Sequence, residues 1–266
     1  MTEWPAGAAE PYAGGPRTND GIQVIARAAE ILRLLRAAPG GLGQAEIGER
    51  IGLARTTVRR ILGALERERL VVSTGPRGRF RLGPDIAWMA EAARRTLITD
   101  LRPYLEELSR EVDETVDLSV LENDQAVFID QVEAPRRLRA VSAVGAAFPA
   151  HCCANGKALL ARLPDDELRR LLPEAPPAVT SNTITTRERL MAELDEVRRT
   201  GVAFDREEHT EGISAVGAAL TGIAAWGTVG ISIPQPTQRF TGREAELSAA
   251  LTEMVATIES TIGRQV

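Results

Sequence analysis

The N-terminal part of the chain contains three runs of apolar residues at helical spacing, and the breaks between them hold glycine. The first run spans residues 22–37 and stops before Pro39, and the second spans Gln44–Ile51. After a turn at Gly52, the third run begins at about Arg55 and repeats its apolar residues at i, i+3, i+4 and i+7. A helix, a tight glycine turn and a further helix in this order predict a helix-turn-helix, in which the apolar stripes of the helices pack against one another.

The third run has a polar face opposite its apolar stripe. Arginine and threonine occupy the first turns of this face, which is the part of a recognition helix that enters the major groove of DNA. Arginine donates two hydrogen bonds to guanine, and threonine contacts phosphate or the methyl group of thymine. The residues that we expect to meet DNA from this face are Arg55, Thr56, Thr57, Arg59 and Arg60.

The stretch from Leu70 to Leu82 has the pattern of a β-hairpin. Two short apolar segments flank a tip rich in glycine, proline and arginine. Arg77 and Arg79 lie at this tip, where we expect them to contact phosphate or the minor groove. Residues 20–83 are therefore predicted to form a winged helix-turn-helix domain.

Formal charge is distributed unevenly along the chain. Residues 17–83 carry 13 arginines against six acidic residues, a net charge of +7, whereas residues 84–266 carry 19 basic and 29 acidic residues, a net charge of −10. This asymmetry indicates a polyanionic partner for the basic segment alone, namely a double-stranded DNA operator. The alternative is a three-helix scaffold whose charged face is merely solvated, but turn, groove-facing residues, hairpin and charge together favour DNA binding.

The acidic remainder of the chain mixes helices and strands. A linker helix is expected over residues 84–98, running from Pro84 to about Arg95, and a second helix near Leu101–Val112 starts the next domain, residues 99–266. Strands are expected at Asp117–Leu121, Ala126–Val132 and Leu138–Val141. Capping boxes that open two later helices are Thr185-x-x-Glu188 and Thr241-x-x-Glu244. This order of elements predicts the α+β fold class.

One long stretch of the chain has no charge. Between Ile213 and Gln238 no residue is charged, but four glycines interrupt the stretch, and Pro234 and Pro236 close it. A membrane-spanning helix needs about 20 strongly apolar residues without such breaks. The stretch instead predicts two buried strands joined at Thr221-Gly222, so no membrane partner is expected.

Several motifs in both parts of the chain are similar to those of one known family. In the basic part they are Gly52-Leu-Ala-Arg-Thr-Thr-Val-Arg-Arg-Ile-Leu62 and the hairpin that runs into Arg81-Leu-Gly83. In the acidic part they are Pro149 with Ala154-Asn-Gly-Lys-Ala-Leu-Leu-Ala161, Gly201-Val-Ala-Phe-Asp-Arg-Glu-Glu-His-Thr-Glu-Gly212 and Val229-Gly-Ile-Ser-Ile-Pro-Gln-Pro236. Over residues 22–266 the chain thus resembles the IclR family of bacterial transcriptional regulators. The resemblance implies a GAF-like antiparallel sheet with an effector pocket, and dimers that pair further into tetramers.

The motif around the two cysteines is expected to form a binding site through its backbone. A helix is expected from Ala154, and the free N–H groups at the start of a helix suit a carboxylate. In the resembled family, backbone amides at the positions of Ala154 and Asn155 hold an effector acid, and its polar partners map onto Asp205 and Ser232. We therefore expect a small organic-acid effector to meet these four residues and Gly156.

The sequence departs from the family pattern at two places in this expected site. Some acid-binding members carry polar residues where this chain has Ala215 and Pro234. Phe148, Trp226 and Ile231 are candidates for further apolar wall. A larger and less polar acid, aromatic in part, fits such a site better than an acid of two or three carbons.

The cysteines and histidines raise a different hypothesis, namely a small-molecule enzyme or a vicinal-thiol redox sensor that carries a DNA-binding head. Neighbouring side chains on a strand point to opposite faces, so His151 is poorly placed to act as a base for Cys152. Adjacent cysteines such as Cys152 and Cys153 lack the C-x-x-C spacing of a metal site, even with His209 added. We therefore expect no catalytic residue, no metal and no cofactor. The enzyme or redox sensor with a DNA-binding head is kept as the alternative hypothesis.

The remaining expectations concern the setting and the assembly. Two adjacent cysteines form no disulfide framework, so a reducing cytoplasm is expected. Residues 1–19 are rich in alanine, glycine and proline and lack the pattern of a signal peptide, so a disordered tail is expected. One small DNA-binding domain buries too little surface for high specificity, so we expect a homodimer on a two-fold site.

Overall fold

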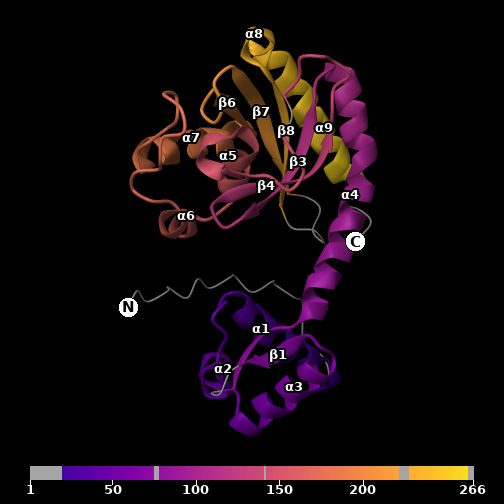
Figure 1. Ribbon diagram of the computed structural model, residues 1–266, viewed down its shortest axis with the longest axis vertical. Helices are drawn as coiled ribbons and strands as arrows, with labels where there is room; N and C mark the ends of the chain where they lie inside the picture. The colour runs from indigo at the N-terminus through magenta and orange to yellow at the C-terminus, as the bar shows by residue number, and fades with distance from the viewer. Residues whose placement is uncertain (1–19, 75–77, 141, 222–227, 263–266) are drawn as a thin grey trace. The chain divides into compact units, whose positions relative to one another are not determined.

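The structure is a computed structural model that describes residues 20–74, 78–140, 142–221 and 228–262 (Figure 1). The predictions that lie outside the described residues concern the tail over residues 1–19, Arg77, Val141, Gly222 at the predicted strand junction, and Trp226. Contacts between Cα atoms divide the chain into two compact units, with the boundary between Arg95 and Thr96. Each unit is built around its own buried apolar core.

The first unit contains three helices and an antiparallel hairpin. Its elements are α1 (Asp20–Arg36), α2 (Gln44–Ile51), α3 (Arg55–Arg67), β1 (Val71–Thr74) and β2 (Arg79–Leu82). Ile31, Ile47 and Val58 come from the three helices and are fully buried against one another. The helix-turn-helix and the hairpin predicted from the sequence are confirmed.

The turn between α2 and α3 depends on one glycine. Gly52 has a φ of 65°, in the left-handed region that other residues avoid, and its N–H donates to the carbonyl oxygen of Gly48. The N–H of Leu53 donates to the same oxygen at 3.0 Å. These bonds end α2 within a few residues, so α3 begins at Arg55 with its apolar stripe turned toward the core.

A single long helix, α4 (Pro84–Val112), replaces the two helices predicted around residues 84–98 and 101–112. Pro103 lies inside it, and a proline removes one backbone hydrogen bond from a helix interior. The prediction of two helices is wrong because one buried stripe runs through the proline. The buried apolar residues of that stripe are Leu97, Leu101, Leu105, Leu108 and Val112.

The second unit is built on a six-stranded antiparallel sheet in the order β5-β4-β3-β8-β7-β6. The strands are β3 (Val116–Glu122), β4 (Gln125–Val132), β5 (Ala147–Pro149), β6 (Val202–Arg206), β7 (Ile213–Leu220) and β8 (Val229–Pro236). The uncharged stretch forms β7 and β8, as predicted. Among the described residues, no helix combines the length and the apolar character that crossing a membrane requires. The α+β class is confirmed.

Helices cover both faces of this sheet (Figure 1). On one face, α4 and α9 (Glu244–Ile262) enclose the larger apolar core. On the other face, α5 (Ala154–Leu160), α6 (Asp165–Leu171) and α7 (Arg187–Thr200) enclose a smaller core. The remaining short helices are η1 (Ala150–Cys152) and α8 (Thr237–Phe240). The sheet therefore separates two layers, and the site described below lies on the layer of α5.

The edge of the sheet differs from the prediction. Residues 138–140 form no strand, Val141 lies outside the described residues, and β5 takes the edge position beside β4. Leu138 is 68% exposed, and the guanidinium group of Arg139 donates to Glu133 and to the carbonyl oxygen of Arg136. Apolar and polar residues alternate in this segment as they do in a strand, but residues 138–140 form a loop in which Arg139 makes these local hydrogen bonds.

The capping predictions are partly corrected. Thr186, not Thr185, caps α7, because its side chain accepts the N–H of Arg189 at 3.4 Å. Gly201 ends the same helix with a φ of 82°, as its position in the sequence predicted. At the start of α9, the side chain of Glu244 accepts the N–H of Gly242 at 2.7 Å.

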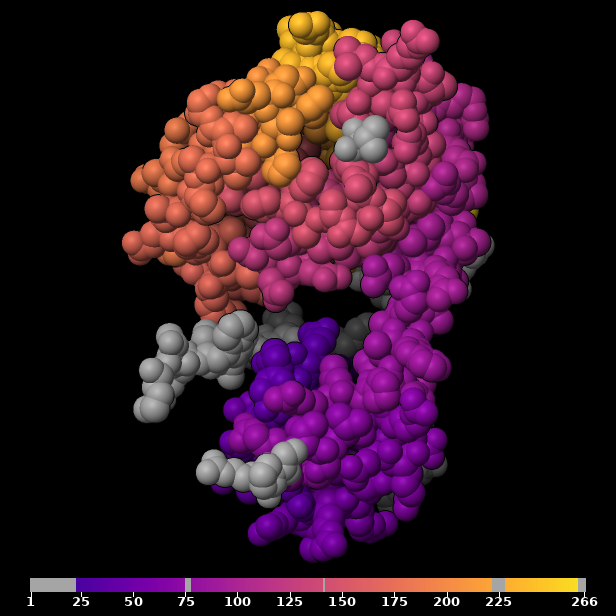
Figure 2. All heavy atoms as spheres, in the orientation of Figure 1, coloured from indigo at the N-terminus to yellow at the C-terminus, as the bar shows by residue number. Residues whose placement is uncertain are grey.

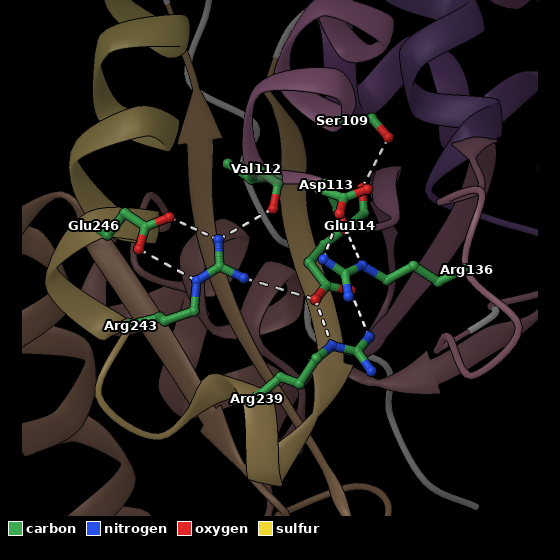
Figure 3. A network of polar contacts seen from close by, with 8 residues as sticks. All are labelled: Ser109, Val112, Asp113, Glu114, Arg136, Arg239, Arg243 and Glu246. Carbon is green, nitrogen blue, oxygen red and sulfur yellow. Dashed lines mark hydrogen bonds and ion pairs between the residues drawn. The ribbon is translucent and has the colours of Figure 1, made fainter.

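A buried carboxyl group fastens the end of α4 to α8 and α9 (Figure 3). Glu114 is fully buried, and Arg239 donates to it through Nε and Nη2, both at 2.7 Å. Arg243 lies 3.7 Å from the same carboxyl group and donates to the carbonyl oxygen of Val112 at 3.1 Å. The carbonyl oxygen of Glu114 accepts the hydroxyl of Ser109 at 2.8 Å. Paired arginine donors bind a carboxylate strongly and in one geometry, so this network fixes the end of α4.

Candidate functional site

A cavity of about 210 Å³ lies on the α5 side of the sheet in the second unit. Four strands contribute to its floor, and the start of α5 and the segment before β5 contribute to its sides. Figure 2 shows this unit hollowed between the pink segment around residue 140 and the orange segment around residue 210. The floor residues are Asp117 on β3, Asp205 on β6, Ala215 on β7, and Ser232 and Pro234 on β8.

The structure gathers at this cavity nearly all the residues that the sequence assigned to an effector. Those that line it are Ala154, Asn155, Asp205, Ala215, Ser232 and Pro234. Gly156 does not line it. A Cβ atom at Gly156 would lie 2.5 Å from the Cα and the carbonyl oxygen of Ala150, so this glycine lets α5 pack closely on η1.

The start of α5 sits directly on the sheet. A Cβ atom at Gly217 on β7 would lie 2.6 Å from the carbonyl carbon of Ala154 and 2.7 Å from the backbone nitrogen of Asn155. The side chain of Asn155 is buried and donates to the hydroxyl of Ser119 on β3 at 2.7 Å. Glycine on the strand and this hydrogen bond hold the first turn of α5, whose N–H groups have no acceptor within the helix, at the cavity wall.

Aromatic rings form another side of the cavity. Phe148 and Phe128 meet edge to face with their ring centroids 4.8 Å apart, and His209 stacks on Phe148 at 3.8 Å. Burial, with the electrostatic effect of His151, lowers the pKa of His209, which favours the neutral form of its ring. Of the predicted apolar wall, Phe148 lines the cavity, whereas Ile231 is buried in the core on the opposite face.

Asp205 is a buried acid whose charge is finely balanced. Its Oδ1 atom accepts the N–H of Glu208 at 2.7 Å. Burial raises the pKa of Asp205 to about 7, against the opposing effect of the backbone hydrogen bond from Glu208 and of the positive charge of Lys157. The carboxyl group of Asp205 therefore titrates near neutral pH.

Asp117 is a buried acid of the cavity that the sequence analysis missed. It is 1% exposed, and its carboxyl group accepts hydrogen bonds from Gln131 at 2.6 Å and from Ser142 at 2.8 Å. Burial raises its pKa to about 7, and both hydrogen bonds act in the opposite direction. The sequence signal for Asp117 was an acidic residue between apolar neighbours in a predicted strand. This signal indicates a cavity only once the positions of the flanking strands β4 and β8 are known.

Lys157, the only lysine of the chain, is fully buried behind the cavity. Its ammonium group lies 2.6 Å from Glu208 and 3.2 Å from Glu193. Glu208 follows β6 and Glu193 belongs to α7. A buried charge needs such partners, so Lys157 joins α5 to α7 and to the segment that carries Asp205.

The two cysteines lie in a setting that suppresses thiolate formation. Both are buried, and both sulfur atoms contact the carbonyl oxygen of Pro149, at 3.3 and 3.5 Å. Burial, with the charges of Asp205 and Glu208, raises the pKa of Cys152 to about 12, and burial raises that of Cys153 well above its usual value. The thiolate is the reactive form of cysteine, so this setting disfavours redox or nucleophilic chemistry.

Neither histidine supports the metal hypothesis. His151 is buried, and its Nε2 atom lies 3.0 Å from the carbonyl oxygen of Pro177. His209 contacts the hydroxyl of Thr210 through Nδ1 at 2.8 Å. Across the part of the chain that the structure describes, no three His, Cys, Asp or Glu side chains are placed to share a metal ion.

In the first unit, α3 presents the polar face predicted for DNA contact. Arg55, Thr56, Arg59 and Arg60 are exposed, and Thr57 is partly buried. Among the ion pairs formed by the described residues, none involves the three arginines. Their guanidinium groups are therefore available to phosphate oxygens or base edges.

Arg79, also predicted to contact DNA, has bonds within the unit. Its guanidinium group donates to the carbonyl oxygen of Gly41 at 2.6 and 3.1 Å and lies 3.3 Å from Glu46. These contacts brace the hairpin against the loop between α1 and α2. A DNA contact by Arg79 stays a prediction, and the structure gives this side chain a bracing role.

A winged helix-turn-helix with a free basic face, on the same chain as an α+β unit with a cavity, defines a DNA-binding transcriptional regulator. The family model for the IclR helix-turn-helix domain matches residues 24–75, and the model for the bacterial transcriptional regulator IclR C-terminal domain matches residues 89–260. The chain belongs to the IclR family of bacterial transcriptional regulators. It is a regulator and not an enzyme.

Similar proteins agree with this assignment over almost the whole chain. The HTH-type transcriptional regulator Rv1719 of Mycobacterium tuberculosis is 59% identical over 240 residues, which cover 90% of this chain and 92% of that protein. The regulator TtgV of Pseudomonas putida is 41% identical over 244 residues, which cover 92% and 93%. The crystal structure of the Thermotoga maritima IclR matches with a TM-score of 0.59 at 27% identity and covers 91% of this chain and 99% of that chain.

Proposed function

We propose that the protein binds a double-stranded DNA operator as a homodimer and that a small organic acid in the cavity modulates this binding. The DNA contacts come from the polar face of α3 and from the hairpin, within a domain spanning residues 20–83. The effector is bound within residues 99–266. The observation that carries the proposal is the convergence of Ala154, Asp205 and Ser232, from separate elements, on one cavity.

The start of α5 supports an acid as the effector. The first N–H groups of a helix lack acceptors within it and lie at the positive end of the helix dipole. The close contact with Gly217 holds the backbone of Ala154 and Asn155 against the sheet, at the cavity wall. We propose that these amides bind the effector carboxylate and that Ser232 and Asp205 complete the polar part of the binding site.

The walls of the cavity favour an aromatic acid over a short aliphatic one. Phe128, Phe148 and His209 offer ring faces and edges, and Ala215 and Pro234 offer no hydrogen bonds from their side chains. Aromatic rings stack on or meet one another edge to face with a favourable energy beyond their buried area. A short acid would leave this apolar surface in contact with water.

The first unit carries an apolar surface that supports dimer formation. Large apolar side chains are exposed on α1 and at the start of α4: Val24 (55%), Ile25 (70%), Trp88 (72%) and Met89 (58%). A second copy of the chain would cover these side chains and remove their apolar surface from water. A dimer also presents two α3 helices to two half-sites, as a two-fold operator requires. Pairing of dimers into tetramers, and action in the cytoplasm, belong to the same proposal.

Calorimetric titration of the full-length protein with aliphatic and aromatic acids tests the effector site. We expect an aromatic acid such as benzoate to bind more tightly than pyruvate. Asp205→Ala and Ser232→Ala should each weaken binding of the best acid by about 1–3 kcal/mol, because a buried polar group loses its partner. Thr252→Ala, an exposed change on α9, is the control. Unchanged binding by both cavity variants would place the effector elsewhere.

A further inference from the structure

Asp117 and Asp205 lie on opposite sides of the cavity floor. In the register of the sheet, Asp117 on β3 is directly opposite Ser232 on β8, and directly opposite residues share a face of the sheet. Asp205 lies on β6, three strand spacings from β3, so the two backbones lie up to about 14 Å apart across the sheet. The start of α5, seated on Gly217 of β7, lies between them in strand order.

The carboxyl group of Asp117 is held in one orientation and still has acceptor capacity. Its Oδ1 atom accepts from the amide of Gln131 at 2.6 Å, and its Oδ2 atom accepts from the hydroxyl of Ser142 at 2.8 Å. Each carboxyl oxygen has a second lone pair. Asp117 is 1% exposed and lines the cavity, so a further donor has to come from a molecule inside the cavity.

The charge of Asp117 has no partner of opposite sign within the described residues. Arg139, the arginine that lines the cavity, is paired with Glu133 at 2.9 Å. A ligand carboxylate beside Asp117 would place two acids together and is disfavoured. A ligand hydroxyl would instead donate to the carboxylate and stabilise its ionised form, and hydrogen bonds to charged acceptors are the strong ones.

We propose that Asp117, oriented by Gln131 and Ser142, is the subsite for a hydroxyl group of the effector. The effector is then an aromatic hydroxy acid. Its carboxylate binds at the start of α5, its ring packs against Phe148 and His209, and its hydroxyl donates to Asp117. This inference rests on the proposed function of the cavity and adds the second functional group of its ligand.

Calorimetric titration of the full-length protein with benzoate, 3-hydroxybenzoate, 4-hydroxybenzoate and phenol tests the subsite. The better hydroxybenzoate should bind at least about 10-fold more tightly than benzoate, which is the size expected for a hydrogen bond to a charged group. Asp117→Asn keeps the size of the side chain and replaces the charged acceptor by a neutral one. It should reduce this preference to about 2-fold, and benzoate should still bind.

Asp124→Asn, the same acid-to-amide change at an exposed position in the turn between β3 and β4, is the matched control. This variant should prefer the same hydroxybenzoate as the wild type. Benzoate binding reports whether Asp117→Asn is folded. If that variant binds no benzoate, Gln131→Met replaces it, and removal of the orienting amide should reduce the preference at least about 3-fold.

The outcomes separate this inference from the proposal on which it rests. Equal binding of benzoate and both hydroxybenzoates by the wild type would overturn the hydroxyl subsite and leave the acid effector standing. Binding of phenol that Asp117→Asn abolishes, without binding of benzoate, would support the subsite and contradict the acid. A preference that survives in Asp117→Asn and in Gln131→Met, or a failure of all four probes to bind, would overturn the inference.

Discussion

The side-chain amide of Gln131 donates a hydrogen bond of 2.6 Å to the carboxyl group of Asp117. The backbone carbonyl oxygen of the same Gln131 accepts a hydrogen bond of 3.0 Å from Arg102 on α4, and Arg102 also donates to Asp130 at 2.7 Å. One residue of β4 thus touches both the floor of the cavity and the helix that begins at Pro84 in the first unit. We expect a ligand that changes the position or charge of Asp117 to act on α4 through this residue.

Arg102→Gln should weaken the response to ligand without weakening ligand binding. The change removes the bonds from α4 to Asp130 and Gln131, but no cavity residue is altered. The factor by which saturating acid changes operator affinity should fall about 2- to 30-fold, the range expected for a residue that couples two sites. Paired titrations of acid by calorimetry and of operator DNA by fluorescence anisotropy measure both quantities. Arg110→Gln, an exposed change on the same helix, is the control, and equal behaviour of the two variants would contradict this role.

Glu114→Gln should destabilise the second unit. The carboxyl group is fully buried and receives two hydrogen bonds from Arg239, so its neutralisation leaves a partly buried arginine without its counter-charge (Figure 3). Breaking such a pair costs about 3–5 kcal/mol of unfolding free energy. Urea unfolding followed by circular dichroism measures the loss. The control, Glu196→Gln, removes a fully exposed partner of Arg199 and should leave the urea unfolding transition unchanged. If Glu114→Gln had an equally small effect, the Glu114 network would add no stability.

The cavity acids predict a particular dependence of stability on pH. Burial raises the pKa of Asp117 and of Asp205 to about 7, above the value of about 4 for an exposed aspartate. Between pH 4 and 7 the folded state therefore binds more protons than the unfolded state. The free energy of unfolding of the ligand-free protein should fall as the pH rises through this window and level off above it.

Asp117→Asn removes one of these acids, so its stability should fall less steeply than that of the wild type between pH 5 and pH 7.5. Calorimetric unfolding at several pH values measures both slopes. Asp124→Asn, an exposed change in the turn between β3 and β4, should keep the wild-type slope. If Asp117→Asn also kept the wild-type slope of stability against pH, the carboxyl group of Asp117 would not be buried in its neutral form.

The first unit was the easier part to predict from the sequence. Its helices bury single stripes that repeat locally, and Gly52 marks the turn between them, so each signal lies within a few residues of the feature that it predicts. The cavity wall around Ala154 was found through motifs rather than through spacing. Its residues come from strands that are far apart in sequence, and pairing between such strands leaves no local periodicity.

The misses have physical reasons of the same kind. Asp117 received no attention because its role depends on Gln131 and Ser142, which reach it only after the sheet has formed. Gly156 was assigned to the ligand, although its missing side chain serves the contact with Ala150. Residues 138–141 alternate as a strand does, but the bonds of Arg139 hold residues 138–140 in a loop. In each instance a tertiary contact outweighed a local pattern.

Changes on the exposed face of α3 should separate phosphate anchors from base readers. Arg59→Ala and Arg60→Ala should each weaken operator binding, and the loss of a phosphate contact should reduce the dependence of log affinity on log salt by about 1. Loss of a base contact should instead cost about 1–3 kcal/mol on the preferred sequence and relax specificity at one base pair. Arg67→Ala, in the last turn of the same helix, is the control. If all three variants bound DNA alike, α3 would not enter the groove.

The most direct test of the account measures operator affinity as a function of the acid that binds best in calorimetry. A labelled duplex selected from a random pool is titrated with full-length protein at increasing concentrations of that acid. The account predicts that saturating acid changes the operator Kd by about 5- to 150-fold. It also predicts that Asp205→Ala shifts the midpoint to higher acid concentration while leaving the ligand-free Kd unchanged. An operator Kd that stays constant while calorimetry shows the cavity filled would contradict it.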